Sequence, residues 1–128
     1  MKKGSRIILG SFLLILLLVL VVYVFYPSYL SVYSVCSPDS FEEDFGDRYY
    51  IAGSVTQEEE NVTLYLEENY DLKTLKHEYI HLFQFSQNRL YGCNRILLKY
   101  FNEVEAYSMS NLPNRIYNWF YPGLFENS

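Results

Sequence analysis

Residues 72–90 read LKTLKHEYIHLFQFSQNRL, and they predict a helix with a polar group near its middle. Apolar residues recur along the stretch at intervals of three and four, which gives the helix one face for a core. Asp71 stands where a helix cap is expected, and Gly92 stands where such a helix would stop. We therefore expect one helix over the whole of this stretch.

His77 and His81 are the chain's only histidines, and they lie four residues apart on the expected helix. Residues at that spacing share a face, so both imidazoles can bind one metal ion. Glu78 would then sit beside the ion and not on it. This is the pattern of a zinc hydrolase, in which the water at the open position has a pKa near 7. The competing interpretation is a pair of histidines packed in a core.

The third ligand is expected on the following helix, which the sequence predicts from Asn94 to about Ser110. Glu103 and Glu105 are the only acidic residues on it. They lie about 160° apart around a helix, so at most one of them can point at the metal. The spacing alone leaves both open.

The segment HEYIH at residues 77–81, followed by NEVEA at residues 102–106, resembles the gluzincin branch of the zincin metallopeptidases. In that family the third ligand is a Glu on the next helix, in the pattern Glu-x-x-x-Asp, and Glu103 falls in the ligand position. Tyr107 stands where the family has an Asp that orients a metal-bound histidine. The resemblance implies that the Tyr107 hydroxyl supplies this bond, or that metal binding is weaker. It covers about residues 60–110.

The resemblance also implies a mechanism and a place for the substrate. The strand at residues 62–66 would be the sheet edge beside which an extended peptide lies. Glu78 would take a proton from the zinc-bound water and pass it to the leaving amine. A further donor often stabilises the oxyanion in such enzymes. Four tyrosines are candidates for it: Tyr100, Tyr107, Tyr117 and Tyr121.

Residues 7–26 carry no charge and are almost entirely apolar. Twenty helical residues span ~30 Å, the core of one bilayer. We expect an uncleaved transmembrane anchor, because the stretch is longer than the apolar region of a signal peptide and ends in aromatic residues. A cleavable signal peptide is the alternative. The basic residues among residues 1–6 predict a cytoplasmic N-terminus and an extracytoplasmic C-terminal domain.

Cys36 and Cys93 would therefore lie in an oxidising compartment, where an even count of cysteines permits one disulfide. A Cys36 thiolate that covers the zinc ion is the less direct alternative. The chain carries 15 acidic and 10 basic residues. This balance argues against nucleic acid as a partner.

The segments between these features complete the expected organisation. Residues 27–47 form a stalk with a short helix at residues 37–46, and strands at residues 48–55 and 62–66 form a hairpin. The aromatic tail is expected to pack back on the domain. The fold class is α+β: a minimal zincin-like domain over residues 48–128, with the hairpin packed on the HExxH helix and on a ligand-bearing helix, preceded by one transmembrane helix.

The expected function is that of a membrane-anchored zinc metallopeptidase, a hydrolase that cleaves peptide bonds in a peptide or protein substrate. Two other functions remain open on the sequence. One is a zinc-binding but catalytically inactive membrane protein of the zincin fold that recognises a partner. The other is a metal-free structural membrane protein.

Overall fold

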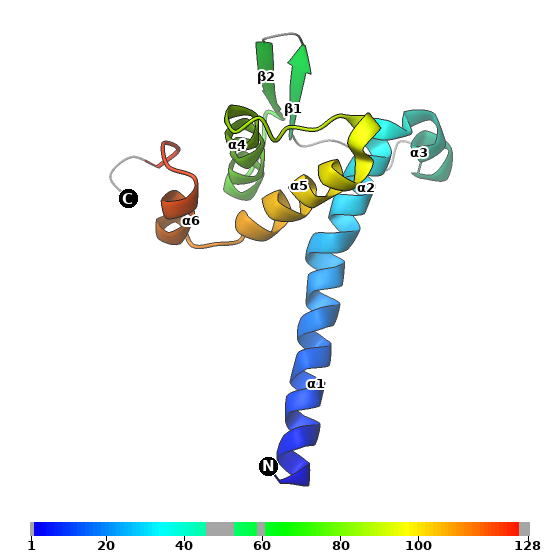
Figure 1. The fold of residues 1–128 in the computed structure, drawn as a ribbon, viewed down its shortest axis with the longest axis vertical. Coiled ribbons are helices and arrows are strands. Elements are labelled where there is room, and N and C mark those ends of the chain that lie inside the picture. The colour runs from blue at the N-terminus through cyan, green and yellow to red at the C-terminus, as the bar shows by residue number, and fades with distance from the viewer. Residues whose placement is uncertain (1, 46–52, 59–60, 126–128) are drawn as a thin grey trace.

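The chain folds as a long N-terminal helix that carries a small domain at its far end (Figure 1). The computed structural model describes residues 2–45, 53–58 and 61–125. These residues are mostly helical, with one two-stranded antiparallel sheet. This agrees with the α+β class and with the long apolar helix expected at the N-terminus.

The long helix is continuous over 34 residues, Lys3–Cys36, and it is long and apolar enough to cross a membrane. It consists of α1 (Lys3–Leu20), a π-helical turn η1 (Val21–Phe25) and α2 (Tyr26–Cys36). The wider turn comes just before Pro27, which has no N–H to donate and would crowd the carbonyl four residues earlier. The helix thus passes through Pro27, and the first part of the expected stalk is helical.

A disulfide joins Cys36, at the end of α2, to Cys93. This is the pairing that the count of two cysteines permits. Cys93 begins the short 3-10 turn η3 (Cys93–Arg95), which leads directly into α5 (Ile96–Met109). Helix α2 packs against α5, so the disulfide closes a contact that already exists. The predicted short helix follows as α3 (Pro38–Phe45).

The hairpin consists of β1 (Gly53–Glu58) and β2 (Asn61–Leu66), paired from Gly53 opposite Leu66 to Glu58 opposite Asn61. The predicted hairpin is confirmed, but its first strand continues to Glu58, past the expected end at residue 55, and residues 48–52 of the expected strand lie outside the described residues. Both strands pack on α4 (Leu72–Ser86). Gly53 makes this possible, because a Cβ at this position would lie 3.0 Å from Cγ of Glu78.

Helix α4 begins as predicted but ends earlier than predicted. The Asp71 side chain accepts a hydrogen bond of 2.8 Å from the Thr74 N–H, as an N-cap does. The expected end near Leu90 is wrong, because Asn88 adopts a left-handed backbone conformation with φ of 58°. The Arg89 N–H then donates to the Gln84 carbonyl at 2.8 Å and closes the helix end.

The core lies between α4, α5 and the C-terminal segment. Its buried members are Ile80, Ala106, Tyr117 and Tyr121. Tyr117 belongs to α6 (Asn114–Phe120), is fully buried, and donates a hydrogen bond of 2.7 Å to the Lys76 carbonyl. The prediction that the aromatic tail packs back on the domain is confirmed.

Candidate metal centre

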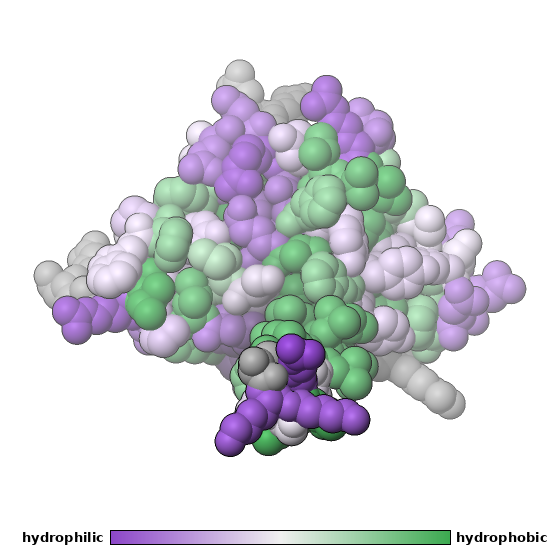
Figure 2. Space-filling view, turned by 60° about the horizontal axis from the view of Figure 1, so that its bottom comes forward, coloured by the Kyte–Doolittle hydropathy of each residue, from purple (hydrophilic) through white to green (hydrophobic). Residues whose placement is uncertain are grey.

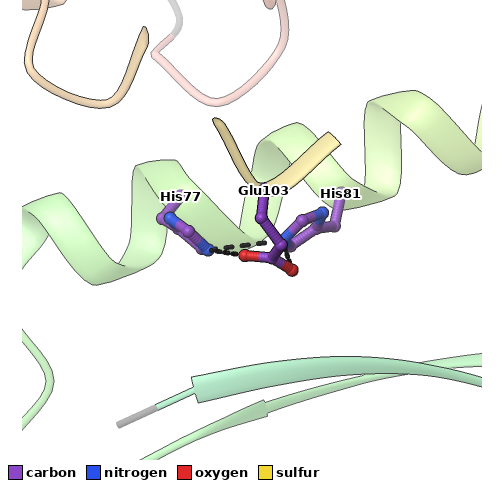
Figure 3. A group of neighbouring side chains, drawn as sticks. All are labelled: His77, His81 and Glu103. Atoms are coloured by element: carbon purple, nitrogen blue, oxygen red, sulfur yellow. Dashed lines mark hydrogen bonds and ion pairs between the residues drawn. The ribbon is translucent and has the colours of Figure 1, made fainter. Parts of the chain in front are cut away.

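Two histidines of α4 and one glutamate of α5 converge on one point (Figure 3). His77 and His81 lie one turn apart, and their Nε2 atoms are 3.3 Å from each other. The Glu103 carboxylate reaches both rings, with Oε2 at 3.3 Å from His77 Nε2 and Oε1 at 3.1 Å from His81 Nε2. All three side chains are largely buried. They could hold a metal ion, and His77, His81 and Glu103 together are called the metal group.

The spacing of these atoms fits a metal ion. Ligand atoms around a tetrahedral zinc ion at ~2.0–2.1 Å lie about 3.3 Å from one another, close to the three distances above. Oε2 of Glu103 is buried and receives no hydrogen bond within the described residues. Two ring nitrogens that face each other also need a proton or a cation between them. Two imidazoles and one carboxylate are a ligand set that catalytic zinc sites use.

The second glutamate of the helix lies outside this group. Glu105 pairs with Arg89 at 3.2 Å and accepts a hydrogen bond of 3.0 Å from the Gln84 amide. Of the two ligands that the spacing left open, the structure therefore brings Glu103 to the histidines and turns Glu105 away.

Glu78 lies beside the metal group, at the limit of ion-pair distance from His77. Its Oε1 is 3.9 Å from His77 Nε2, and its Oε2 is buried with no hydrogen bond from the described residues. Burial raises the pKa of Glu78, and the neighbouring histidines lower it in part. A buried carboxylate next to a metal position, with one oxygen that accepts no hydrogen bond from the described residues, is suited to accept a proton from water.

The charges within the group stabilise each other. Burial is the largest single influence and disfavours the charged forms of both His81 and Glu103, but the charge interactions and hydrogen bonds with the neighbouring residues together outweigh it. The pKa of His81 is raised to about 9, and the pKa of Glu103 lies well below its ordinary value. The raised pKa favours the protonated form of His81, and a metal ion bound at Nε2 would displace that proton.

Gln84 fixes the orientation of His81, and sequence reasoning missed this residue. Its amide nitrogen donates to the Asn102 carbonyl at 3.1 Å and to Glu105 at 3.0 Å, which leaves its oxygen facing His81. That oxygen lies 2.9 Å from Nδ1 of His81. Nδ1 therefore carries a hydrogen, and Nε2 is the atom that faces the metal position.

Tyr107 contacts the metal group through its ring. Its ring packs edge-on against the His77 ring, with 4.2 Å between the centroids. This contact restricts the tilt of the imidazole. A role for Tyr107 in orienting a histidine therefore has a basis in ring packing.

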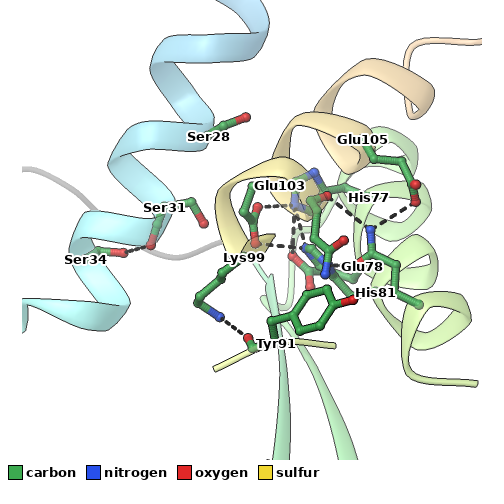
Figure 4. Close-up of polar contacts among 12 residues, drawn as sticks. Ser28, Ser31, Ser34, His77, Glu78, His81, Tyr91, Lys99, Glu103 and Glu105 are labelled. Carbon is green, nitrogen blue, oxygen red and sulfur yellow. Dashed lines mark hydrogen bonds and ion pairs between the residues drawn. The ribbon is translucent and has the colours of Figure 1, made fainter. Parts of the chain in front are cut away.

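The metal group opens into a cavity of about 300 Å³. One wall comes from α2, through Ser31 and Ser34, and Figure 4 shows that wall beside the metal group. Another wall comes from β1. Residues of β2 are not among those that line the cavity, so the strand beside it is β1, at residues 53–55, and not residues 62–66 as expected.

The four tyrosines considered as oxyanion donors differ in whether they line the cavity. Only Tyr107 lines the cavity. Tyr117 and Tyr121 belong to the core, and the Tyr100 hydroxyl donates to the Phe25 carbonyl at 3.4 Å. Tyr91, which sequence reasoning did not single out, also lines the cavity. Its carbonyl accepts a long hydrogen bond of 3.5 Å from the Lys99 amine, another lining residue that was missed.

No family model, curated protein or solved structure matches the chain. The likeness to the gluzincins thus rests on residues 77–81 and 102–106.

Proposed function

We propose that the protein is a membrane-anchored zinc metallopeptidase. The observation that carries the proposal is the convergence of His77, His81 and Glu103, with the Glu78 carboxylate beside them. A zinc ion held by these three residues supplies an acidified water and polarises a carbonyl. Among zinc sites, this ligand set with a neighbouring carboxylate that is not itself a ligand is typical of hydrolases.

In this proposal the chain's own residues divide the work. Glu78 accepts a proton from the attacking water and passes it to the leaving amine. Gln84 keeps Nε2 of His81 turned towards the metal. Tyr107 is the tyrosine of the four candidates that is placed to reach a substrate in the cavity.

An extended peptide is the substrate that suits the cavity. Residues 53–55 of β1 line it, and β1 pairs with β2 along one edge and with no other described strand. Backbone pairing along the other edge of β1 would hold a peptide across the metal group. The substrate is therefore proposed to add a strand next to β1.

The test replaces Glu78 by Gln in the full-length protein, purified in detergent and loaded with zinc. We expect the variant to bind zinc as the wild type does and to lose about 10²- to 10⁴-fold in the rate of cleavage of a fluorogenic peptide library. Glu68→Gln makes the same chemical change at an exposed position and should leave the rate unchanged. Equal rates for Glu78→Gln and the wild type would rule out this mechanism. Full zinc loading of the wild type without cleavage of any peptide would point to a zinc-binding protein that is inactive.

A further inference from the structure

Helix α5 has a second face, opposite the one that reaches the metal group. Its buried residues are Asn102, Glu103 and Ala106. On the other side Leu97 and Phe101, four residues apart and thus on one face, are 63% and 56% exposed. Other large apolar residues of this part of the molecule are also exposed: Ile96 and Leu98 in α5, and Trp119 and Phe120 in α6. A surface of this kind is unusual on a domain that water surrounds.

The exposed face of α5 carries no charge. The charged side chains of the helix point elsewhere: Lys99 lines the cavity, Glu103 belongs to the metal group, and Glu105 pairs with Arg89. The chain as a whole is acidic, so this neutral and apolar face differs from the composition of the rest of the protein.

The height at which α5 packs against the long N-terminal helix indicates what surrounds this exposed face. The side chains of α1 are exposed throughout, and Val24 is the first buried residue of the long helix. The domain therefore begins to pack at Val24, close to the end of the apolar stretch of residues 7–26, which spans ~30 Å as a helix. Tyr100 of α5 donates its hydroxyl to the Phe25 carbonyl at that level.

The arrangement of the elements is consistent with this position. Helix α5 runs sideways from α2 towards α6, while the hairpin lies at the far end of the domain (Figure 1). In a view tilted so that the free end of α1 comes forward, hydrophobic residues, interspersed with more polar ones, are visible on the underside of the domain behind the long helix (Figure 2). Exposed tyrosines at positions 23, 26 and 29 lie at the same height along the long helix. Tyrosine is enriched where membrane proteins cross the surface of the bilayer.

We propose that the exposed face of α5, centred on Leu97 and Phe101, lies in the surface of the lipid bilayer and holds the domain against the membrane. The inference rests on the membrane anchor of the proposed function and adds a second contact to it. Because the metal group lies on the opposite side of α5, it sits about one helix diameter, ~10 Å, from the lipid. Substrate segments that reach it are then those close to the bilayer surface.

The test uses tryptophan fluorescence, because Trp119 is the only tryptophan of the chain. In a Trp119→Phe background, a single tryptophan is placed at Phe101, at Tyr65 of the hairpin, or at Tyr23 of the long helix, all exposed positions. Each variant is reconstituted in phosphatidylcholine vesicles with normal or brominated acyl chains. Bromine quenches only tryptophans that contact the chains. Zinc binding by each variant verifies its fold.

We expect brominated lipid to reduce the fluorescence of Phe101→Trp and of Tyr23→Trp, and to leave that of Tyr65→Trp unchanged. Quenching at Tyr23→Trp without quenching at Phe101→Trp would overturn the docking of α5 and leave the anchor intact. If Tyr23→Trp is not quenched either, the membrane anchor itself is wrong, and the docking of α5 is wrong with it. Self-association through position 101 in place of quenching would identify the face as a contact between copies and overturn the proposal.

Discussion

A chain of hydrogen bonds behind the metal group determines which nitrogen of His81 faces the metal. It runs from His81 through Gln84 to Glu105 and then to Arg89, which also donates to the side chain of the exposed Gln87 at 2.9 Å. Gln84 is fully buried, so each of its amide atoms needs a partner. Glu105, one of the two candidate metal ligands in the sequence, belongs to this outer network and not to the metal group.

Replacing Gln84 by Leu tests this network. The substitution keeps the approximate volume but removes the acceptor for Nδ1 of His81, so we expect zinc affinity to fall about 10- to 100-fold. Competition with a chromophoric chelator measures the affinity. Gln87→Leu, at an exposed position just past the end of α4, is the matched control and should bind zinc like the wild type. Unchanged affinity in Gln84→Leu would contradict the role given to this residue.

Helix spacing alone determines the positions of the residues that the sequence predicts, whereas tertiary packing determines the role of those it misses. His77, Glu78 and His81 were predictable because a helix fixes which positions share a face. Gln84 and Gln87 are the same residue type three positions apart, and only the packing of α5 makes the first buried and the second exposed. No local pattern separates them.

Two helices depart from the expected boundaries, each because of one residue. Asn88 ends α4 before Gly92 by adopting a left-handed conformation, which asparagine tolerates better than most residues. Pro27 does not stop the long helix, because the π-helical turn before it absorbs the missing hydrogen bond. The assignment of β1 to the cavity depends on how the hairpin packs on α4, which its alternating pattern does not encode.

The disulfide between Cys36 and Cys93 gives a prediction for the contact of α2 with α5. It closes a loop with a sequence separation of 57, for which the chain-entropy model gives a stabilisation of about 4 kcal/mol. We expect the double variant Cys36→Ser/Cys93→Ser to lose about 2–4 kcal/mol in unfolding free energy, measured by denaturant titration in detergent. Reduced wild type should match the variant. Equal stability of the oxidised wild type and the variant would show that the disulfide contributes nothing.

The whole molecule combines a long apolar helix with a metal group held just beyond its end. Composition was enough to predict a long apolar helix at the N-terminus, because twenty consecutive residues there carry no charge. The contribution of α2 to the cavity was not predictable, since it arises from packing between segments more than 50 residues apart in the chain, such as Ser31 and Lys99. The same packing brings the exposed face of α5 to the level at which the long helix is proposed to leave the bilayer.

The measurement that tests the central claim most directly is the zinc content of the purified full-length protein and of two single variants, Glu103→Ala and Glu105→Ala, after dialysis against trace zinc. The account predicts one zinc ion per chain in the wild type and in Glu105→Ala, and loss of the ion in Glu103→Ala. A wild type that binds no zinc, or a Glu103→Ala variant that keeps the ion while Glu105→Ala loses it, would contradict the account.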